Sequence, residues 1–226
     1  MVDQSRVVRG RTEIWVPHNG KEIAFVFQEF GPDTYANVGT AIEQAKLAKP
    51  SAAETASLLD RVYDNKDHNY ASQEFSHIRK RMNSNWLWAF TGTLWTPEGA
   101  YIQDDPETRE GMPFMDQSEL VKKLESKDPS VRFVPYGFKT GRISSLELSK
   151  NSYVIGLAGE EGADKLARVA DTFRRQPCLY ALINVTEPKT RVTALDSFWD
   201  VGDRRLGVGG NLRGDDGLSY SLGVFK

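Results

Sequence analysis

The sequence has a single cysteine, Cys178, so it can form neither an internal disulfide nor a metal site built from paired cysteines. Cys178 begins the apolar run CLYALINV, where we expect an ordinary buried thiol. Apolar runs of about 18 residues, as a membrane span requires, are missing, and the first residues do not resemble a signal peptide. We therefore expect a cytoplasmic protein that does not contact a membrane.

Neither sign of charge is in excess, because 29 Lys and Arg residues stand against 31 Asp and Glu residues. Dedicated nucleic-acid modules are usually basic overall, so this balance counts against that class while leaving room for a local basic patch. Aromatic residues, in contrast, are plentiful: 11 Phe, 8 Tyr and 5 Trp in 226 residues. Disordered chains are poor in aromatics, so the composition predicts a folded chain with a large core.

Periodicity and capping signals predict a mixture of strands and helices. Asn19-Gly20 accepts the backbone angles of a tight turn and predicts a hairpin over residues 11–28. Ser51 and Glu54 form a capping box at the start of a helix. Further helices are expected at these places: 34–47, 71–82, 116–125 and, as a short capped piece, 144–151.

Two apolar patterns predict how the strands are buried. In the first part of residues 85–95, the side chains expected on both faces of a strand are apolar, as in a strand that is covered on both faces. Residues 218–224 alternate between large apolar and small polar residues, as in a half-buried strand. Because no linker or repeat divides the chain, we expect residues 1–226 to form a single α+β domain, with a mixed, largely antiparallel sheet covered by several short helices.

The stretch YVIGLAGEEGADKLARVADTFRR, residues 153–175, resembles a phosphate-binding turn because an apolar run leads through three glycines into a helix. Its glycines, Gly156, Gly159 and Gly162, miss the dinucleotide spacing by one residue. Glu160 and Glu161 stand where the helix is expected to begin, and their charges would repel a phosphate from the helix N-terminus. We interpret this stretch as a strand and a helix with a structural role.

A basic run follows on the expected helix 71–82. His77, Arg79, Lys80 and Arg81 lie within five positions, and Trp86 comes shortly after them. Cations that track phosphates beside aromatic faces that stack on bases are typical of single-stranded nucleic-acid binding. The alternative is a solvated helix face beside core tryptophans.

The glycine-rich segment GVGGNLRGDDG, residues 207–217, is the other candidate site. As a long loop it could bring Asp215 and Asp216 to a hard cation such as Mg²⁺, with Asp196, Asp200 and Asp203 nearby. The alternative is a hairpin connection made of ordinary turn formers.

Other catalytic patterns are weak. The sequence lacks the G-x-S-x-G elbow of serine hydrolases, its three histidines lack zinc spacing, and Asp104, Asp105 and Glu107 fit a polar loop. We therefore expect a binding module without a cofactor, whose partner is a nucleic acid or a protein and whose oligomeric state the sequence leaves open. A metal-assisted hydrolase or phosphoryl-transfer enzyme at Asp215 and Asp216 is the alternative.

Overall fold

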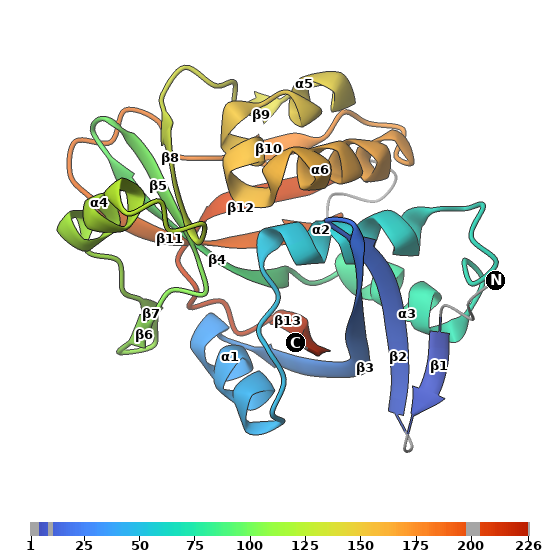
Figure 1. Cartoon of the computed structure of the whole chain (residues 1–226). Coiled ribbons are helices and arrows are strands. Elements are labelled where there is room, and N and C mark those ends of the chain that lie inside the picture. Colours follow the sequence, from blue (N-terminus) through green and yellow to red (C-terminus); the bar gives the residue numbers. More distant parts are fainter. Residues whose placement is uncertain (1–4, 9–10, 198–203, 226) are drawn as a thin grey trace.

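The computed structural model describes residues 5–8, 11–197 and 204–225 and confirms an α+β fold in a single domain. The described residues form these helices: α1 (Tyr35–Gln44), α2 (Ala52–Tyr63), α3 (Gln73–Met82), α4 (Gln117–Glu125), α5 (Ser145–Ser149) and α6 (Ser152–Asp171). In Figure 1 the helices α5 and α6 lie at the top, α2 lies near the centre, and α4, α1 and α3 lie at the left, the bottom and the right.

The strands of the described residues contribute to one large sheet and one small ribbon. They are β1 (Ser5–Val8), β2 (Arg11–His18), β3 (Lys21–Asp33), β4 (Leu87–Thr96), β5 (Gly99–Asp104), β6 (Thr108–Arg109), β7 (Met112–Pro113), β8 (Val131–Pro135), β9 (Gly141–Arg142), β10 (Cys178–Tyr180), β11 (Lys189–Asp196), β12 (Gly207–Leu212) and β13 (Ser219–Phe225). The small ribbon is β6 with β7.

The large sheet is mixed and mostly antiparallel, as the sequence predicts. Its strands follow the order β1-β2-β3-β13-β4-β11-β12-β10-β9, and β5 and β8 branch from β4. Two pairs are parallel, β13 with β4 and β10 with β12, while the other pairs of the sheet run antiparallel. The last strand, β13, therefore lies between an early strand and the central strand β4, which ties both ends of the chain into one sheet.

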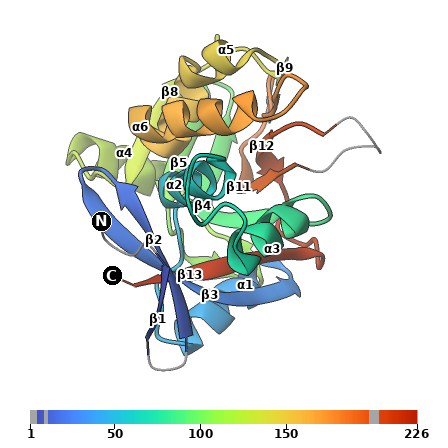
Figure 2. The ribbon, with the colours of Figure 1, turned by 90° about the vertical axis from the view of Figure 1, so that its right-hand side faces the viewer.

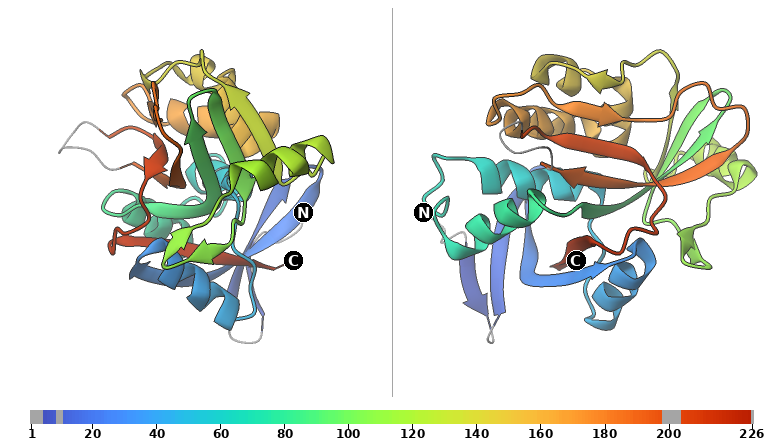
Figure 3. Two further views of the ribbon diagram at one scale, coloured as in Figure 1. Left: turned by 90° about the vertical axis from the view of Figure 1, so that its left-hand side faces the viewer. Right: turned by 180° about the vertical axis from the view of Figure 1, so that it is seen from behind.

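The main core fills the space between the sheet and the helices α2, α3 and α6. Leu59 of α2, Phe75 of α3, Leu166 of α6 and Trp95 of β4 belong to one buried cluster. In Figure 2 the three helices lie one below the other on the same side of the domain. Seen from behind, strands β11 and β12 pass in front of α2 and α6 (Figure 3). Burial of this continuous apolar surface is the main stabilising contribution.

Local signals are confirmed where they depend on neighbouring residues. Asn19 and Gly20 connect β2 to β3 with φ angles of 49° and 72°. At the start of α2, Ser51 Oγ accepts a hydrogen bond from the Glu54 backbone N–H at 3.2 Å, and Glu54 Oε2 accepts one from the Ser51 N–H at 2.7 Å. The ten residues of β4 are all buried, as the pattern that is apolar on both faces predicts.

The prediction of a strand at the start of residues 153–175 is wrong, because these first residues belong to the first half of α6. Asn151 caps the helix, with its Oδ1 accepting hydrogen bonds from the backbone N–H groups of Tyr153 and Val154. The helix is kinked at Gly159, whose φ of 71° is left-handed and strained for other residues. A side chain at Gly156 would collide with Val134 and Ile102, so this glycine lets the helix approach the sheet.

Two expectations for the C-terminal segment also need correction. Residues 207–212 form the strand β12 rather than a loop, and a Cβ at Gly210 would lie 1.8 Å from Tyr153 Oη, so α6 packs directly on the strand backbone. The strand β13 is covered on both faces instead of one. Its Ser221 is buried and donates a hydrogen bond to the Trp88 carbonyl at 3.0 Å, which makes a small polar residue acceptable there.

Candidate functional site

Two of the four basic residues predicted on α3 are paired with one carboxylate of the sheet. Nε2 of His77 lies 2.6 Å from Oε1 of Glu29, and Nε of Arg81 donates to both Glu29 oxygens at 3.1 Å. Glu29 belongs to β3, so this contact joins α3 to the sheet. The paired charges are therefore used within the domain, and the basic run does not form a continuous positive track.

Arg79 holds α3 to the end of α2. Its Nη1 donates to the Val62 carbonyl and its Nη2 to the Tyr70 carbonyl, both at 2.5 Å, and the guanidinium lies 4.0 Å from the centre of the Tyr70 ring. These partners are carbonyls and an aromatic face rather than carboxylates. The positive charge of Arg79 is therefore held in place without being neutralised by an ion pair.

Lys80 and Trp86, the remaining predicted residues of this run, have different surroundings. The Lys80 side chain is exposed, and no ion pair or hydrogen bond engages its ammonium group within the part of the chain that the structure describes. Trp86 is half-buried, packs against the core cluster beneath α1 and meets the Tyr180 ring edge-on at 6.4 Å. Trp86 thus has a packing role, and it does not line the cavities described next.

A cavity of about 370 Å³ opens beside α3 and brings distant segments together. We call it the α3 cavity; it is lined by Tyr63, Ser76, Arg79, Lys80, Asn83, Phe173 and Arg204. The rings of Tyr63 and Phe173 form its apolar part, with their centres 5.3 Å apart. The structure therefore places Arg79 and Lys80 in one site, together with a third cation, Arg204, from the segment before β12.

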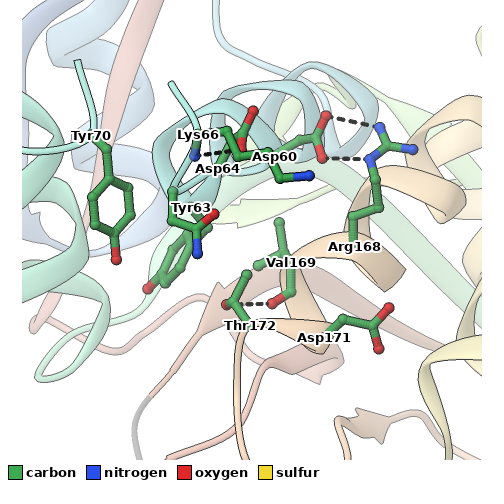
Figure 4. A pocket seen from close by; sticks show the side chains of 10 residues that line it. Asp60, Tyr63, Asp64, Lys66, Tyr70, Arg168, Val169, Asp171 and Thr172 are labelled. Carbon is green, nitrogen blue, oxygen red and sulfur yellow. Dashed lines mark hydrogen bonds and ion pairs between the residues drawn. The ribbon is translucent and has the colours of Figure 1, made fainter. Parts of the chain in front are cut away.

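A second cavity of about 570 Å³ shares Tyr63 with the first and lies between α2, the following loop and α6 (Figure 4). We call it the α6 cavity; it is lined by Asp60, Tyr63, Asp64, Asn65, Lys66, Tyr70, Arg168, Val169, Asp171 and Thr172. Nε and Nη2 of Arg168 donate to the Asp60 carboxylate at 2.9 Å and 2.8 Å, and this bond raises the pKa of Arg168. Charges of both signs therefore line the α6 cavity.

The phenol of Tyr63 stays neutral between the two cavities. Burial raises the pKa of Tyr63 to about 12, while its hydrogen bond to Ser197 and the charges of Arg79 and Arg204 act in the opposite direction. The influence of both arginines on this ring agrees with their places in the α3 cavity. At neutral pH Tyr63 contributes an aromatic surface, and its hydroxyl donates to Ser197 Oγ at 3.4 Å.

The predicted metal ligands lie in the turn before β13. Asp215 is exposed, whereas Oδ1 of Asp216 accepts a hydrogen bond from the Leu218 N–H at 2.8 Å, as is usual for a turn. Asp196 is buried in β11, and Asp200 and Asp203 lie outside the described residues. Within residues 5–8, 11–197 and 204–225, no group of three His, Cys, Asp or Glu side chains is placed to hold a metal ion. Metal binding at Asp215 and Asp216 stays a prediction.

Sequence reasoning found two residues of the α3 cavity and missed the others. Ser76 and Asn83 lie on or next to the predicted helix and gave no signal of their own. Tyr63, Phe173 and Arg204 come from three other segments. The packing of α2 against α3 and α6 brings Tyr63 and Phe173 to the cavity, and the entry of β12 into the sheet brings Arg204. An arginine in an irregular segment has no periodicity from which its neighbours could be inferred.

Comparisons with known proteins bear on the fold. No family model matches the sequence, and no curated protein matches it either. A solved structure described as "Accommodation of massive sequence variation in Nanoarchaeota by the C-type lectin fold" is similar, with a TM-score of 0.56 and 18% identity over 92% of this chain and 100% of its own. At this identity the likeness concerns architecture: the chain has a fold similar to the C-type lectin fold. Among the described residues, no helix has the length and apolar character to cross a membrane.

Proposed function

We propose that the chain is a binding module for another protein, which docks over the α3 and α6 cavities. The observation that carries this proposal is the pair of adjoining cavities around Tyr63, built from α2, α3, α6 and the segment before β12. Partly exposed aromatic rings beside arginines are typical of the centres of protein interfaces. The similarity to a fold that accommodates massive sequence variation in another protein also suits a scaffold for recognition.

A protein partner is favoured over a nucleic acid because the positive charge is local. Binding to a nucleic-acid backbone depends on many phosphate contacts spread along a groove. On α3, Glu29 pairs with Arg81 and contacts His77, so the cations of the helix that lack an ion-pair partner among the described residues, Arg79 and Lys80, both line the α3 cavity. Trp86, the aromatic residue that would stack on a base, packs in the core instead.

The test compares two variants that change the same charge on the same face of α6. Asp171 lines the α6 cavity, and Asp164 lies two turns earlier, is exposed and does not line it. A library of displayed protein fragments is selected on the wild-type domain, and the affinity of each binder is measured for Asp171→Lys and Asp164→Lys. We expect Asp171→Lys to weaken binding about tenfold or more and Asp164→Lys to leave it within about twofold.

Oligonucleotides provide the opposing arm of the same experiment. Single- and double-stranded oligonucleotides are titrated at two salt concentrations. Tight binding that falls steeply with salt would show a nucleic-acid partner and overturn the proposal. Fragments that bind both variants equally well would place the interface elsewhere on the domain and would also contradict it.

A further inference from the structure

The side chains of the α3 cavity form an unusual electrostatic set. Lys80 and Arg204 are exposed cations without an ion-pair partner among the described residues, and Arg79 donates to two carbonyls and the Ser76 hydroxyl, which are all neutral. No Asp or Glu belongs to the described residues that line this cavity. Among the described residues, three positive charges therefore converge on one small volume that no carboxylate lines.

The neutral polar side chains of the cavity also present donors. Ser76 Oγ accepts a hydrogen bond from Nη2 of Arg79 at 3.3 Å, which leaves the hydroxyl proton free to donate. Asn83 Oδ1 accepts a hydrogen bond from the Ser197 hydroxyl at 2.8 Å, and Ser197 Oγ in turn accepts from the Tyr63 hydroxyl at 3.4 Å. Because the Asn83 oxygen is occupied, the amide Nδ2 with its two hydrogens is the group that remains for a ligand.

From these two observations we infer that the α3 cavity binds a phosphate group, carried by a phosphorylated side chain of the protein partner. A phosphate monoester offers several acceptor oxygens and no obligatory donor, which complements a cavity whose charged and polar side chains present donors. This inference rests on the proposed function and names the chemistry that the partner must present.

The charge count favours phosphate over a carboxylate. A phosphorylated side chain carries about −1.5 to −2 charges at neutral pH, which offsets most of the positive charge of Arg79, Lys80 and Arg204. An Asp or Glu side chain carries one charge and would leave two of the three cations unmatched. The rings of Tyr63 and Phe173 line the same cavity and form its apolar part.

Three degenerate peptide libraries, which differ only in a central phosphoserine, glutamate or serine, test the inference. Calorimetry measures the binding of each library and of inorganic phosphate to the intact chain. We expect the phosphoserine library to bind at least tenfold more tightly than the glutamate library, and the serine library to bind weakest. The affinity of the phosphoserine library is expected to fall as the pH drops below about 6, where the phosphate takes up its second proton.

A pair of double variants with equal loss of charge locates the site. Lys80→Gln/Arg204→Gln removes the two unpaired cations of the cavity, and Lys122→Gln/Arg213→Gln removes two exposed cations elsewhere. The first is expected to reduce phosphoserine and phosphate binding at least tenfold and the second to leave both within twofold. Thermal melting of both variants shows whether each remains folded.

Two outcomes would overturn the phosphate inference without contradicting the proposed function. Equal binding of the phosphoserine and glutamate libraries would show a protein-binding site without a preference for phosphate. Phosphate binding that both double variants lose equally would show general attraction to positive charge rather than a site. Failure of the proposed function is recognised independently, because protein fragments would then not distinguish Asp171→Lys from Asp164→Lys.

Discussion

The Ser197 hydroxyl donates to Asn83 Oδ1 over 2.8 Å, and this bond fixes which end of the Asn83 amide faces the α3 cavity. Ser197 is fully buried and its own backbone N–H donates to the Met82 carbonyl at 2.8 Å, so the orientation is held by the core. A residue that does not line the cavity thereby decides whether Asn83 offers a donor or an acceptor to a ligand.

The substitution Asn83→Asp tests this relationship, because it keeps the size and the acceptor for Ser197 but replaces the amide donor with a charged oxygen. We expect phosphate and phosphopeptide affinity to fall about tenfold or more, since a hydrogen bond to a charged group contributes about 1.5–3 kcal/mol. Calorimetry measures the affinity, and a thermal melt serves as the control for folding. Unchanged affinity would show that the amide does not meet the anion.

Arg81 supplies a contrast within the same helix, because its charge is matched by Glu29. Arg81→Gln is expected to leave phosphate affinity within about twofold and to lower the free energy of unfolding by up to about 1 kcal/mol, as for a partly exposed ion pair. Chemical denaturation measures the stability and calorimetry the affinity. A large loss of affinity would mean that the whole outer face of α3 contacts the ligand.

The packing of α6 on β12 predicts unequal effects for two glycines of the same sequence segment. Gly210→Ala would place a Cβ 1.8 Å from the Tyr153 hydroxyl, which is buried and bonded to Thr93 at 2.9 Å, so we expect a destabilisation of about 1–3 kcal/mol or more. Gly217 has open space around it, and Gly217→Ala is expected to change stability by less than about 0.5 kcal/mol. Urea denaturation measures the free energy of unfolding of both variants. Equally mild effects would contradict the strand and would fit the loop that the glycine content suggests.

Glu161 links α6 to the hairpin of β2 and β3 and gives a pH-dependent contribution to stability. The hydrogen bond from Lys165 lowers the pKa of Glu161, assisted by the backbone N–H of Asn19 and opposed by burial. A carboxyl whose folded pKa is lowered stabilises the fold above its unfolded pKa of about 4.3, and this contribution is lost as the pH falls through the folded value.

We therefore expect Glu161→Gln to be less stable than the wild type at pH 6–7, with a difference that shrinks as the pH approaches 3. Glu160→Gln is the matched control, because Glu160 is the exposed neighbour and has no ion-pair partner among the described residues. Urea denaturation across this pH range measures both variants. A difference that stays constant or grows at low pH would contradict the assignment.

The sequence predicts the elements that depend on local chemistry and misses those that depend on tertiary packing. The Asn19-Gly20 turn and the Ser51–Glu54 capping box follow from residues a few positions apart. The first half of α6 is misread because a short apolar run with β-branched residues fits a strand or a buried helix equally well. Its true signal is the helix cap at Asn151, whose side-chain oxygen accepts from the N–H groups of Tyr153 and Val154.

The candidate site shows the same division. The run from His77 to Arg81 indicates positive charge on α3, but it does not reveal that Glu29 from β3 neutralises part of that charge. Nor does it reveal that Arg204 joins Arg79 and Lys80, because this depends on how β12 enters the sheet. The sequence therefore identifies the helix that carries the site, and the fold determines which of its charges are free to bind.

The most direct test of the phosphate site is an NMR titration of the isotopically labelled chain with inorganic phosphate, observed at the Asn83 side-chain amide and the Arg204 guanidinium. Both signals are expected to shift along one saturating curve, while the guanidinium of Arg81, paired with Glu29, stays unchanged. An Asn83 amide that does not respond, or shifts that grow linearly at arginines across the whole surface, would contradict a phosphate site in the α3 cavity.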